Sequence, residues 1–244
     1  MEQINRITLS QRLKAYRRNP SSFIMLLLVL TAAVITFSTL LFLVGYILIK
    51  GIPNITPSLF SLKYTSENVS LLPALITTVI MTFLSLLIAA PLGIFSAIYL
   101  VEYSKKGNKI VGAVRITAET LSGIPSIVYG LFGLLFFVTT LGWGYSILAG
   151  AFTLAIMILP LIMRTTEEAL KAVPDTYREG SFGLGAGRLR TVFKVVLPSA
   201  VPGILAGIIL AVGRIVGETA ALIYTAGTVA DIPENVMSSG STLS

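Results

Sequence analysis

An arginine and a glutamate lie four residues apart in one of the most apolar stretches of the chain. Arg214 and Glu218 belong to the run Gly-Arg-Ile-Val-Gly-Glu-Thr, and this spacing predicts that both side chains share one face of a helix. Ionisable groups inside a membrane span usually face a bundle interior or a water-filled path. The planar guanidinium of Arg214 suits an oxyanion, and Glu218 can weaken the binding of that anion to the arginine. The alternative is a self-neutralising pair that only holds two helices together.

A second arginine follows another apolar stretch. Arg164 stands in the run Leu-Ile-Met-Arg-Thr-Thr-Glu-Glu. It can bind an anion at the inner mouth of a path, or it can anchor a helix end at the membrane surface.

Two further patterns concern helix geometry. Pro125, within Ser122–Ser126, predicts a kink because proline lacks a backbone donor, and the kink serves either packing or a substrate contact. Glycines spaced four apart predict close approach between helices; the pairs are Gly203 with Gly207 and Gly213 with Gly217.

A polar and basic segment, residues 176–202, separates two apolar stretches. A capping box that begins at Thr176 predicts a helix start, and the next helix break is predicted at the glycines 183, 185 and 187. A second short helix should extend to Pro198, with an apolar side formed by Leu189, Val192, Phe193 and Val196. Two such helices are typical of docking into a partner's groove; an amphipathic loop on anionic lipid is the alternative.

Composition places the chain in a bilayer. Of its 244 residues, 55% are hydrophobic and 12% charged, and the mean hydropathy is +0.88, whereas soluble chains are about one quarter charged. The apolar runs are continuous rather than alternating, which excludes a closed β-barrel and leaves an all-α membrane protein. The net charge of +7 does not indicate nucleic acid, because the basic residues are spread between the apolar runs.

Several kinds of chemistry are not indicated. Neither cysteine nor histidine occurs, so we expect no disulfide and no zinc site. No Walker-type loop is present, so we do not expect ATP to bind this chain through one. No carboxylate pair, Ser/His/Asp set or Cys/His set indicates hydrolysis. We therefore expect a chain that is not an enzyme and carries no cofactor.

The apolar runs divide the chain. Five of them are long enough to span a membrane, at about 23–49, 71–101, 121–141, 146–163 and 201–221. We expect Pro91 and Gly93 to interrupt the second. The predicted divisions are a basic N-terminal segment, the first span, a loop and a transmembrane domain that contains the 176–202 segment, with bounds 1–22, 23–49, 50–70 and 71–244.

The distribution of lysine and arginine predicts the orientation. The segments 1–22, 102–119 and 164–197 hold 15 of these residues, and the opposite side holds two, Lys50 and Lys63. Basic loops stay in the cytoplasm. The N-terminus and the 176–202 segment are therefore expected there, and five spans would leave Ser244 outside.

The 176–202 segment resembles the EAA loop of ATP-driven importer permeases. The motif residues, at the family's spacing, are Glu179, Gly180, Ser181, Gly185, Val195, Leu197 and Pro198. Gly180 and Ser181 replace alanines of the motif, and Val195 replaces an isoleucine. Residues 121–132, 160–167 and 211–219 resemble the phosphate-specific importer permeases. The Arg-Thr-Thr-Glu run from Arg164 is more similar to the A-type subunit than to its C-type partner.

This resemblance implies the helical core of a type I ABC importer permease in the cytoplasmic membrane of a prokaryote. It implies pairing with a C-type permease subunit, docking of two ATP-binding subunits on the EAA loops, and delivery of phosphate by an extracytoplasmic binding protein. The phosphate path would include Arg164, Arg214 and Glu218. The family has a sixth span after the region equivalent to 231–244, so we expect a chain truncated at its C-terminus.

Other functions stay open. The same kind of importer can carry molybdate, sulfate or a phosphonate, and only the Arg-x-x-Gly-Glu-Thr and Arg-Thr-Thr-Glu runs favour phosphate. An ATP-independent carrier or channel is a further alternative. Such carriers often contain two related halves, and the sequence shows no internal repeat.

Overall fold

The computed structural model describes residues 20–105 and 107–244, and these contain helices and turns but no strand. The chain divides into two compact units, Met1–Thr56 and Pro57–Ser244. The basic segment predicted over 1–22 lies, except for its last three residues, outside the described residues.

The first unit contains one long helix. Helix α2 (Pro20–Gly51) is followed by a short turn, η1 (Ile52–Asn54). None of the described side chains of α2 is buried. The helix and turn are long and apolar enough to cross a membrane, as predicted for 23–49. The first unit by itself covers none of these apolar side chains, so they are available to lipid, to the rest of the chain or to another protein.

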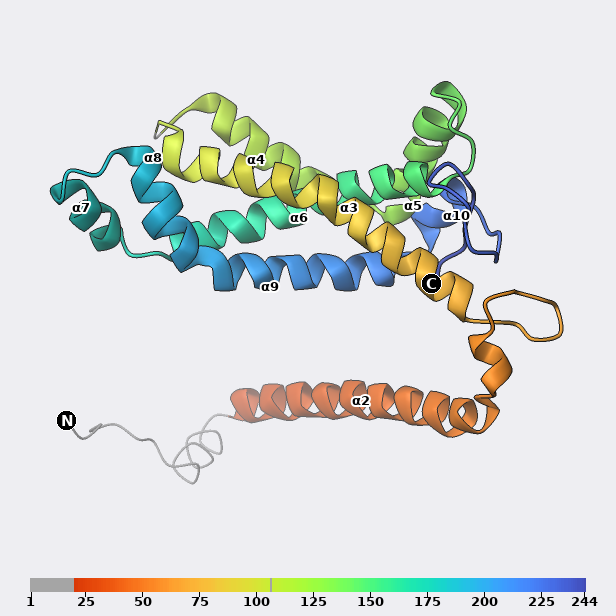
Figure 1. Cartoon of the computed structure of the whole chain (residues 1–244). Coiled ribbons are helices and arrows are strands. Elements are labelled where there is room, and N and C mark those ends of the chain that lie inside the picture. The colour runs from red at the N-terminus through yellow and green to blue at the C-terminus, as the bar shows by residue number, and fades with distance from the viewer. Residues whose placement is uncertain (1–19, 106) are drawn as a thin grey trace. The chain divides into compact units, whose positions relative to one another are not determined.

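The second unit is a helical bundle. After η2 (Pro57–Phe60), its elements in chain order are α3 (Leu72–Ile98), η3 (Tyr99–Tyr103), α4 (Lys109–Ser122), α5 (Ser126–Gly133), η4 (Leu134–Thr140), α6 (Ile147–Lys171), α7 (Asp175–Gly183), α8 (Arg188–Thr191), η5 (Val192–Val196), α9 (Leu197–Val216) and α10 (Ala220–Thr225). The elements η3, η4 and η5 are wide π-type turns that continue the helices beside them. Helices α7 and α8 lie at one end of the bundle, and α10 lies at the other (Figure 1).

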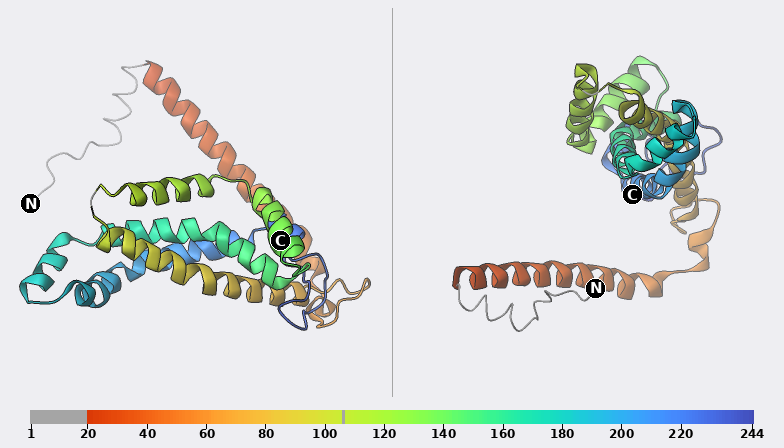
Figure 2. Two further views of the ribbon diagram at one scale, coloured as in Figure 1. Left: turned by 90° about the horizontal axis from the view of Figure 1, so that it is seen from above. Right: turned by 90° about the vertical axis from the view of Figure 1, so that its left-hand side faces the viewer.

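Helix α6 is the centre of this bundle. It packs between α3 and α9, and α4 lies along it (Figures 1 and 2). Two thirds (67%) of its apolar stretch is buried, against 33% for α3 and 28% for α9. The core around it contains Met81, Ile158, Ile162 and Ile215. Much of the apolar surface of α3 and α9 is therefore left for lipid or for a partner.

The second predicted span was wrong in one respect. Helix α3 continues without interruption through Pro91. Gly93 does not end the helix either: a Cβ at this position would lie 2.9 Å from Cγ2 of Ile162. The glycine instead lets α3 approach α6 closely.

The third predicted span is replaced by a bent pair of helices. Helix α4 ends at Ser122, α5 begins at Ser126, and the two differ in direction by 100°. The kink expected at Pro125 is therefore confirmed, because Pro125 is the residue that caps the start of α5. The predicted basic loop over 102–119 is largely helical, since η3 and α4 occupy most of it. Long, apolar helices in the described residues number four, or five if this pair counts as one span.

The first glycine pair packs as predicted. A Cβ at Gly203 would lie 2.6 Å from Cβ of Ala169, and one at Gly207 would lie 2.7 Å from Cβ of Thr165. Close approach of α9 to α6 therefore depends on both glycines. Gly213 differs, since a Cβ there would meet no described atom within 4 Å.

We expect Gly207→Ala to destabilise the chain by about 1–3 kcal/mol, because the added methyl overpacks the contact with Thr165. Thermal unfolding of the purified chain in detergent measures this effect. Gly213→Ala is the matched control on the same helix, and we expect it to be neutral or slightly stabilising, because alanine is the better helix former. Equal melting temperatures for the two variants would contradict the role of Gly207.

Candidate functional site

Arg164 lies within a helix rather than at its end. The fourth predicted span stopped at Met163, but α6 continues to Lys171. The charged run is helical because Arg164 with Glu168, and Glu167 with Lys171, are salt-bridged four residues apart along the helix. Arg164 is not left as a lone anchor: its Nε lies 3.2 Å from Glu168 Oε1, and its Nη1 lies 3.9 Å from Glu119 Oε1 on α4.

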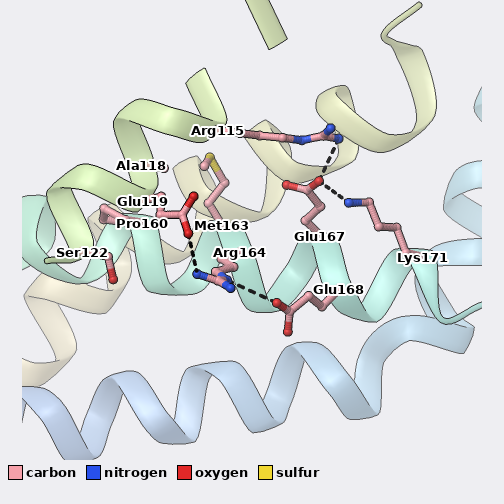
Figure 3. Close-up of a pocket in the computed structure, with 10 residues that line it drawn as sticks. All are labelled: Arg115, Ala118, Glu119, Ser122, Pro160, Met163, Arg164, Glu167, Glu168 and Lys171. Carbon is pink, nitrogen blue, oxygen red and sulfur yellow. Dashed lines mark hydrogen bonds and ion pairs between the residues drawn. The ribbon is translucent and has the colours of Figure 1, made fainter. Parts of the chain in front are cut away.

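A second ionic group lies one helical turn further along α6. The side chain of Glu167 is 9% exposed, and its Oε1 lies 2.7 Å from Arg115 Nη2 of α4 and 2.5 Å from Lys171 Nζ. Figure 3 shows both groups together. Helix α4 packs Val111 and Ala118 against an apolar cluster of the bundle, and the ion pair of Arg115 with the buried Glu167 adds a polar contact to α6.

These residues surround a pocket of about 230 Å³. It is lined by Arg115, Ala118, Glu119, Ser122, Pro160, Met163, Arg164, Glu167, Glu168 and Lys171 (Figure 3). The three cations and three carboxylates balance in formal charge. A phosphate or sulfate oxygen accepts the same charge-assisted hydrogen bonds from arginine as a carboxylate does. An oxyanion entering the pocket can therefore replace Glu119 or Glu168 at the Arg164 guanidinium.

Sequence reasoning missed the α4 side of this pocket. Arg115 and Glu119 were assigned to a basic loop, and their pairing with α6 links residues 45 or more positions apart. One signal in the sequence could have indicated this side of the pocket. Arg115 and Glu119 are four residues apart, and residues at this spacing share one face of a helix.

Arg214 and Glu218 do not form the predicted pair. Helix α9 ends at Val216, and Gly217 is its C-terminal cap. Glu218 therefore leaves the helix face of Arg214. Its Oε1 accepts a hydrogen bond of 3.0 Å from the Ala221 N–H at the start of α10, and the residue is only 7% exposed. The prediction was wrong because the glycine ends the helix before its last turn is complete.

Arg214 stands alone in this part of the bundle. It is half-buried, it interacts electrostatically with the Tyr129 phenol, and the described residues place no carboxylate within 4 Å of it. Gly207 lies beside Thr165, so Arg214 is about two helical turns, roughly 10 Å, from the level of Arg164 along the bundle. The two arginines therefore occupy different levels, and Arg214 does not line the Arg164 pocket.

The 176–202 segment contains one short helix, α7, and the start of a long helical stretch instead of the second short helix that was predicted. Helix α7 begins at Asp175, and Pro174 occupies the N-cap position. No side chain caps the start of this helix. The Thr176 capping box is thus wrong, because the proline already starts the helix. The turn between α7 and α8 contains Gly185 with φ of +83°, a conformation that favours glycine. Ser181 and Thr191 join the helices through a 2.8 Å hydroxyl contact.

Pro198 does not end the second helix. Helix α8, η5 and α9 form one continuous helical stretch, Arg188–Val216. In the wide turn η5 the Leu197 N–H bonds the Val192 carbonyl, five residues back. This wider turn makes room for the proline ring, and Pro198 enters the first turn of α9, where its missing N–H is not needed.

The motif residues separate into exposed and covered groups. Glu179 and Gly180 on α7 are exposed, Ser181 is half-buried, Gly185 in the turn is exposed, Val195 and Leu197 are half-buried, and Pro198 is exposed. The apolar stripe also divides, since Val192 and Val196 are buried in the bundle whereas Leu189 is 66% exposed. Leu184, in the turn, is 91% exposed. The segment thus presents an apolar surface outward, formed by Tyr177, Phe182, Leu184, Leu189 and Phe193.

Sequence reasoning also missed the contacts of Arg178, on α7. Its Nη2 lies 2.7 Å from Glu102 Oε1 in η3 and 2.9 Å from the Leu170 carbonyl, and its Nη1 lies 2.8 Å from the Val173 carbonyl. The hydrogen bond to Glu102 raises the pKa of Arg178 above its ordinary value, and this arginine is charged in any case. It therefore supplies donors to the carboxyl end of α6, where backbone carbonyls lack helical partners.

The family described as "Binding-protein-dependent transport system inner membrane component" matches residues 89–239, which include the Arg164 pocket, the 176–202 segment and Arg214. The chain belongs to this family. It is therefore a transport permease.

Curated permeases are similar over most of the described bundle. The probable ABC transporter permease protein YqgI of Bacillus subtilis (strain 168) is 40% identical over 200 residues, which cover 81% of this chain and 67% of that protein. Phosphate transport system permease protein PstA 1 of Mycobacterium tuberculosis (strain CDC 1551 / Oshkosh) is 39% identical over 63% of this chain and 50% of its own length. PstA of Pasteurella multocida (strain Pm70) is 40% identical over 72% and 63%. The chain thus spans between half and two thirds of the length of these relatives.

A solved permease has a similar fold. A chain of the MetNI methionine ABC transporter in an inward-facing conformation aligns with a TM-score of 0.50 and 25% identity, covering 59% of this permease and 67% of that chain. The fold class is therefore the all-α core of a type I ABC importer permease, as the sequence resemblance implied.

Proposed function

We propose that this permease is the membrane-spanning, A-type subunit of an ATP-driven importer of inorganic phosphate. The observation that carries the proposal is the 39–40% identity to two phosphate transport system permease proteins. The charges support it, since Arg164 has carboxylate partners that an oxyanion can replace and Arg214 has none among the described side chains.

The direction of transport follows from the distribution of charge. The basic segments 102–119 and 164–197 lie toward the α7–α8 end of the bundle (Figure 1), which would face the cytoplasm. Phosphate, released by a binding protein outside, would pass the level of Arg214 first and that of Arg164 about 10 Å later. Two arginines, one after the other along the path, lower the free-energy cost of moving an anion through a bilayer. The carboxylates beside Arg164 compete with phosphate and so keep this arginine from binding it too tightly.

The partners follow from the surfaces left uncovered. The outward apolar surface of the 176–202 segment would dock on an ATP-binding subunit, with a second such subunit on the C-type permease. The uncovered sides of α3 and α9 would meet that C-type permease or lipid. Because this chain lacks a Walker-type loop, ATP hydrolysis would occur on the docked subunits.

Uptake of labelled phosphate tests this function. Membrane vesicles would contain this permease, its C-type partner, the ATPase and the binding protein, with unlabelled sulfate and molybdate as competitors. We expect uptake that requires ATP and resists a large excess of either competitor. Inhibition by sulfate or molybdate would assign another oxyanion as the cargo, and uptake that continues without the ATPase would indicate an autonomous carrier.

A further inference from the structure

Helix α7 is attached to the bundle mainly by one arginine. Within the described residues, no side chain of α7 is buried. Arg178 and Ser181 are partly covered. Only 15% of the Arg178 side chain is accessible, and it reaches Glu102, whose side chain is 8% exposed. The Nε of Arg178 also lies 3.2 Å from Glu102 Oε1, so two nitrogens of one guanidinium contact the same carboxylate.

Both short helices contact the same wide turn. Arg178 of α7 pairs with Glu102 of η3, and Arg188 of α8 lies over the Tyr103 ring of η3, 5.9 Å from its centroid. Cation–π contacts of this length are attractive. The turn η3 directly continues α3, so any displacement of α7 and α8 pulls on the end of that helix.

The same arginine also contacts the end of α6. It donates to the carbonyls of Leu170 and Val173, which belong to the last turn of α6 and the residues just after it. Arg164 lies six residues before Leu170, or about 9 Å along the helix. Arg178 therefore links α7 by hydrogen bonds to the end of the helix that carries the Arg164 pocket.

We propose that Arg178 and Glu102 form the joint through which movement of α7 is transmitted to the ends of α3 and α6. The proposal rests on the proposed function, in which an ATPase docks on α7. A planar guanidinium held by a carboxylate and two carbonyls resists displacement in several directions, whereas the surface of α7 offers no buried apolar contact that could do so. Without the joint, α7 would still dock and move, but α3 and α6 would follow it poorly.

The test measures phosphate uptake per ATP hydrolysed by the complete importer in vesicles, for Glu102→Gln and Arg178→Lys. Glu102→Gln keeps the shape of the acceptor but removes its charge, and Arg178→Lys keeps the positive charge but loses the planar fork of donors. We expect uptake per ATP to fall about three- to thirtyfold, the range found for residues that couple distant sites, while ATP hydrolysis stays near the wild-type rate. Asp175→Asn is the matched control: Asp175 also contacts Arg178, at 3.2 Å, but 87% of its side chain is exposed, and such pairs contribute little.

A cargo-independent readout separates this proposal from the assignment of phosphate. The chain has no cysteine, so spin labels can be placed at cysteines replacing Tyr99 in η3 and Thr176 in α7. In the otherwise wild-type importer we expect the label distance to stay constant to within about 2 Å when a non-hydrolysable ATP analogue binds. In Glu102→Gln we expect a change of about 5 Å, close to a displacement by one helical turn. An unchanged distance in both forms would overturn the proposal, as would uptake and hydrolysis that fall in parallel. Failure of the wild-type complex to take up phosphate would instead concern the cargo.

Discussion

Replacing Arg214 by glutamine is expected to lower ATP-driven phosphate uptake roughly a hundredfold, the usual effect of removing one partner from a desolvated charged contact. Arg214 is half-buried within α9, and the described residues offer it no carboxylate. A charge in that position is costly unless it faces a water-filled path or a ligand. Glutamine keeps the length and some hydrogen bonding but loses the charge that attracts the anion.

The measurement is the initial rate of labelled phosphate uptake at matched membrane levels of the assembled importer. Arg214→Lys should retain part of the activity, because it keeps a point charge but loses the planar fork. Lys63→Gln, in an exposed loop of the same unit, controls for loss of a positive charge in general. Normal uptake by Arg214→Gln would remove Arg214 from the path and leave it as a packing residue.

Replacing Leu184 by aspartate is expected to abolish docking of the ATPase and with it all ATP-driven uptake. Leu184 is 91% exposed at the turn between α7 and α8, the position from which a single apolar side chain can enter a partner's groove. Anchors of this kind carry much of the energy of an interface. Aspartate at the same place would bring an unpaired carboxylate into that groove, and burying such a charge is strongly unfavourable.

Copurification of the ATPase with the permease, followed by uptake, measures this effect. We expect recovery of the ATPase to fall at least tenfold, because a loss of about 1.4 kcal/mol already has that consequence. Leu62→Asp is the control, since Leu62 is 62% exposed but lies far along the chain from the 176–202 segment. An ATPase that binds Leu184→Asp normally would show that docking uses another surface.

Local sequence signals predicted the helices and some of their ends. Hydropathy located α2, α3, α6 and α9, and Gly185 and Pro125 marked a real turn and a real break. Proline and glycine were misjudged where neighbouring structure compensates for them. Pro198 is accommodated by the wide turn η5, and Gly93 serves packing against Ile162.

The candidate site was predicted less completely, because its contacts link distant residues. Arg164 and Arg214 were identified by type, as cations within apolar stretches. The partners were not, since Glu119 reaches Arg164 from another helix and Glu102 lies 76 residues before Arg178. Spacing along one helix indicates which residues share a face, but it does not indicate which helix lies opposite. The pairing of Arg214 with Glu218 failed for a local reason, the end of α9 at Gly217.

The glycine contact between α6 and α9 has a mechanical consequence. In most helix pairs, ridges of side chains on one helix fit into grooves on the other helix. This interlocking resists sliding of the two helices. At Gly203 and Gly207 the backbone of α9 lies directly against Ala169 and Thr165, so the contacts at these two positions involve no long side chain. Small shear displacements of α9 along α6 therefore encounter a low barrier. An importer that must open alternately to each side of the membrane would have, beside Arg164, a smooth surface on which its two helices can slide.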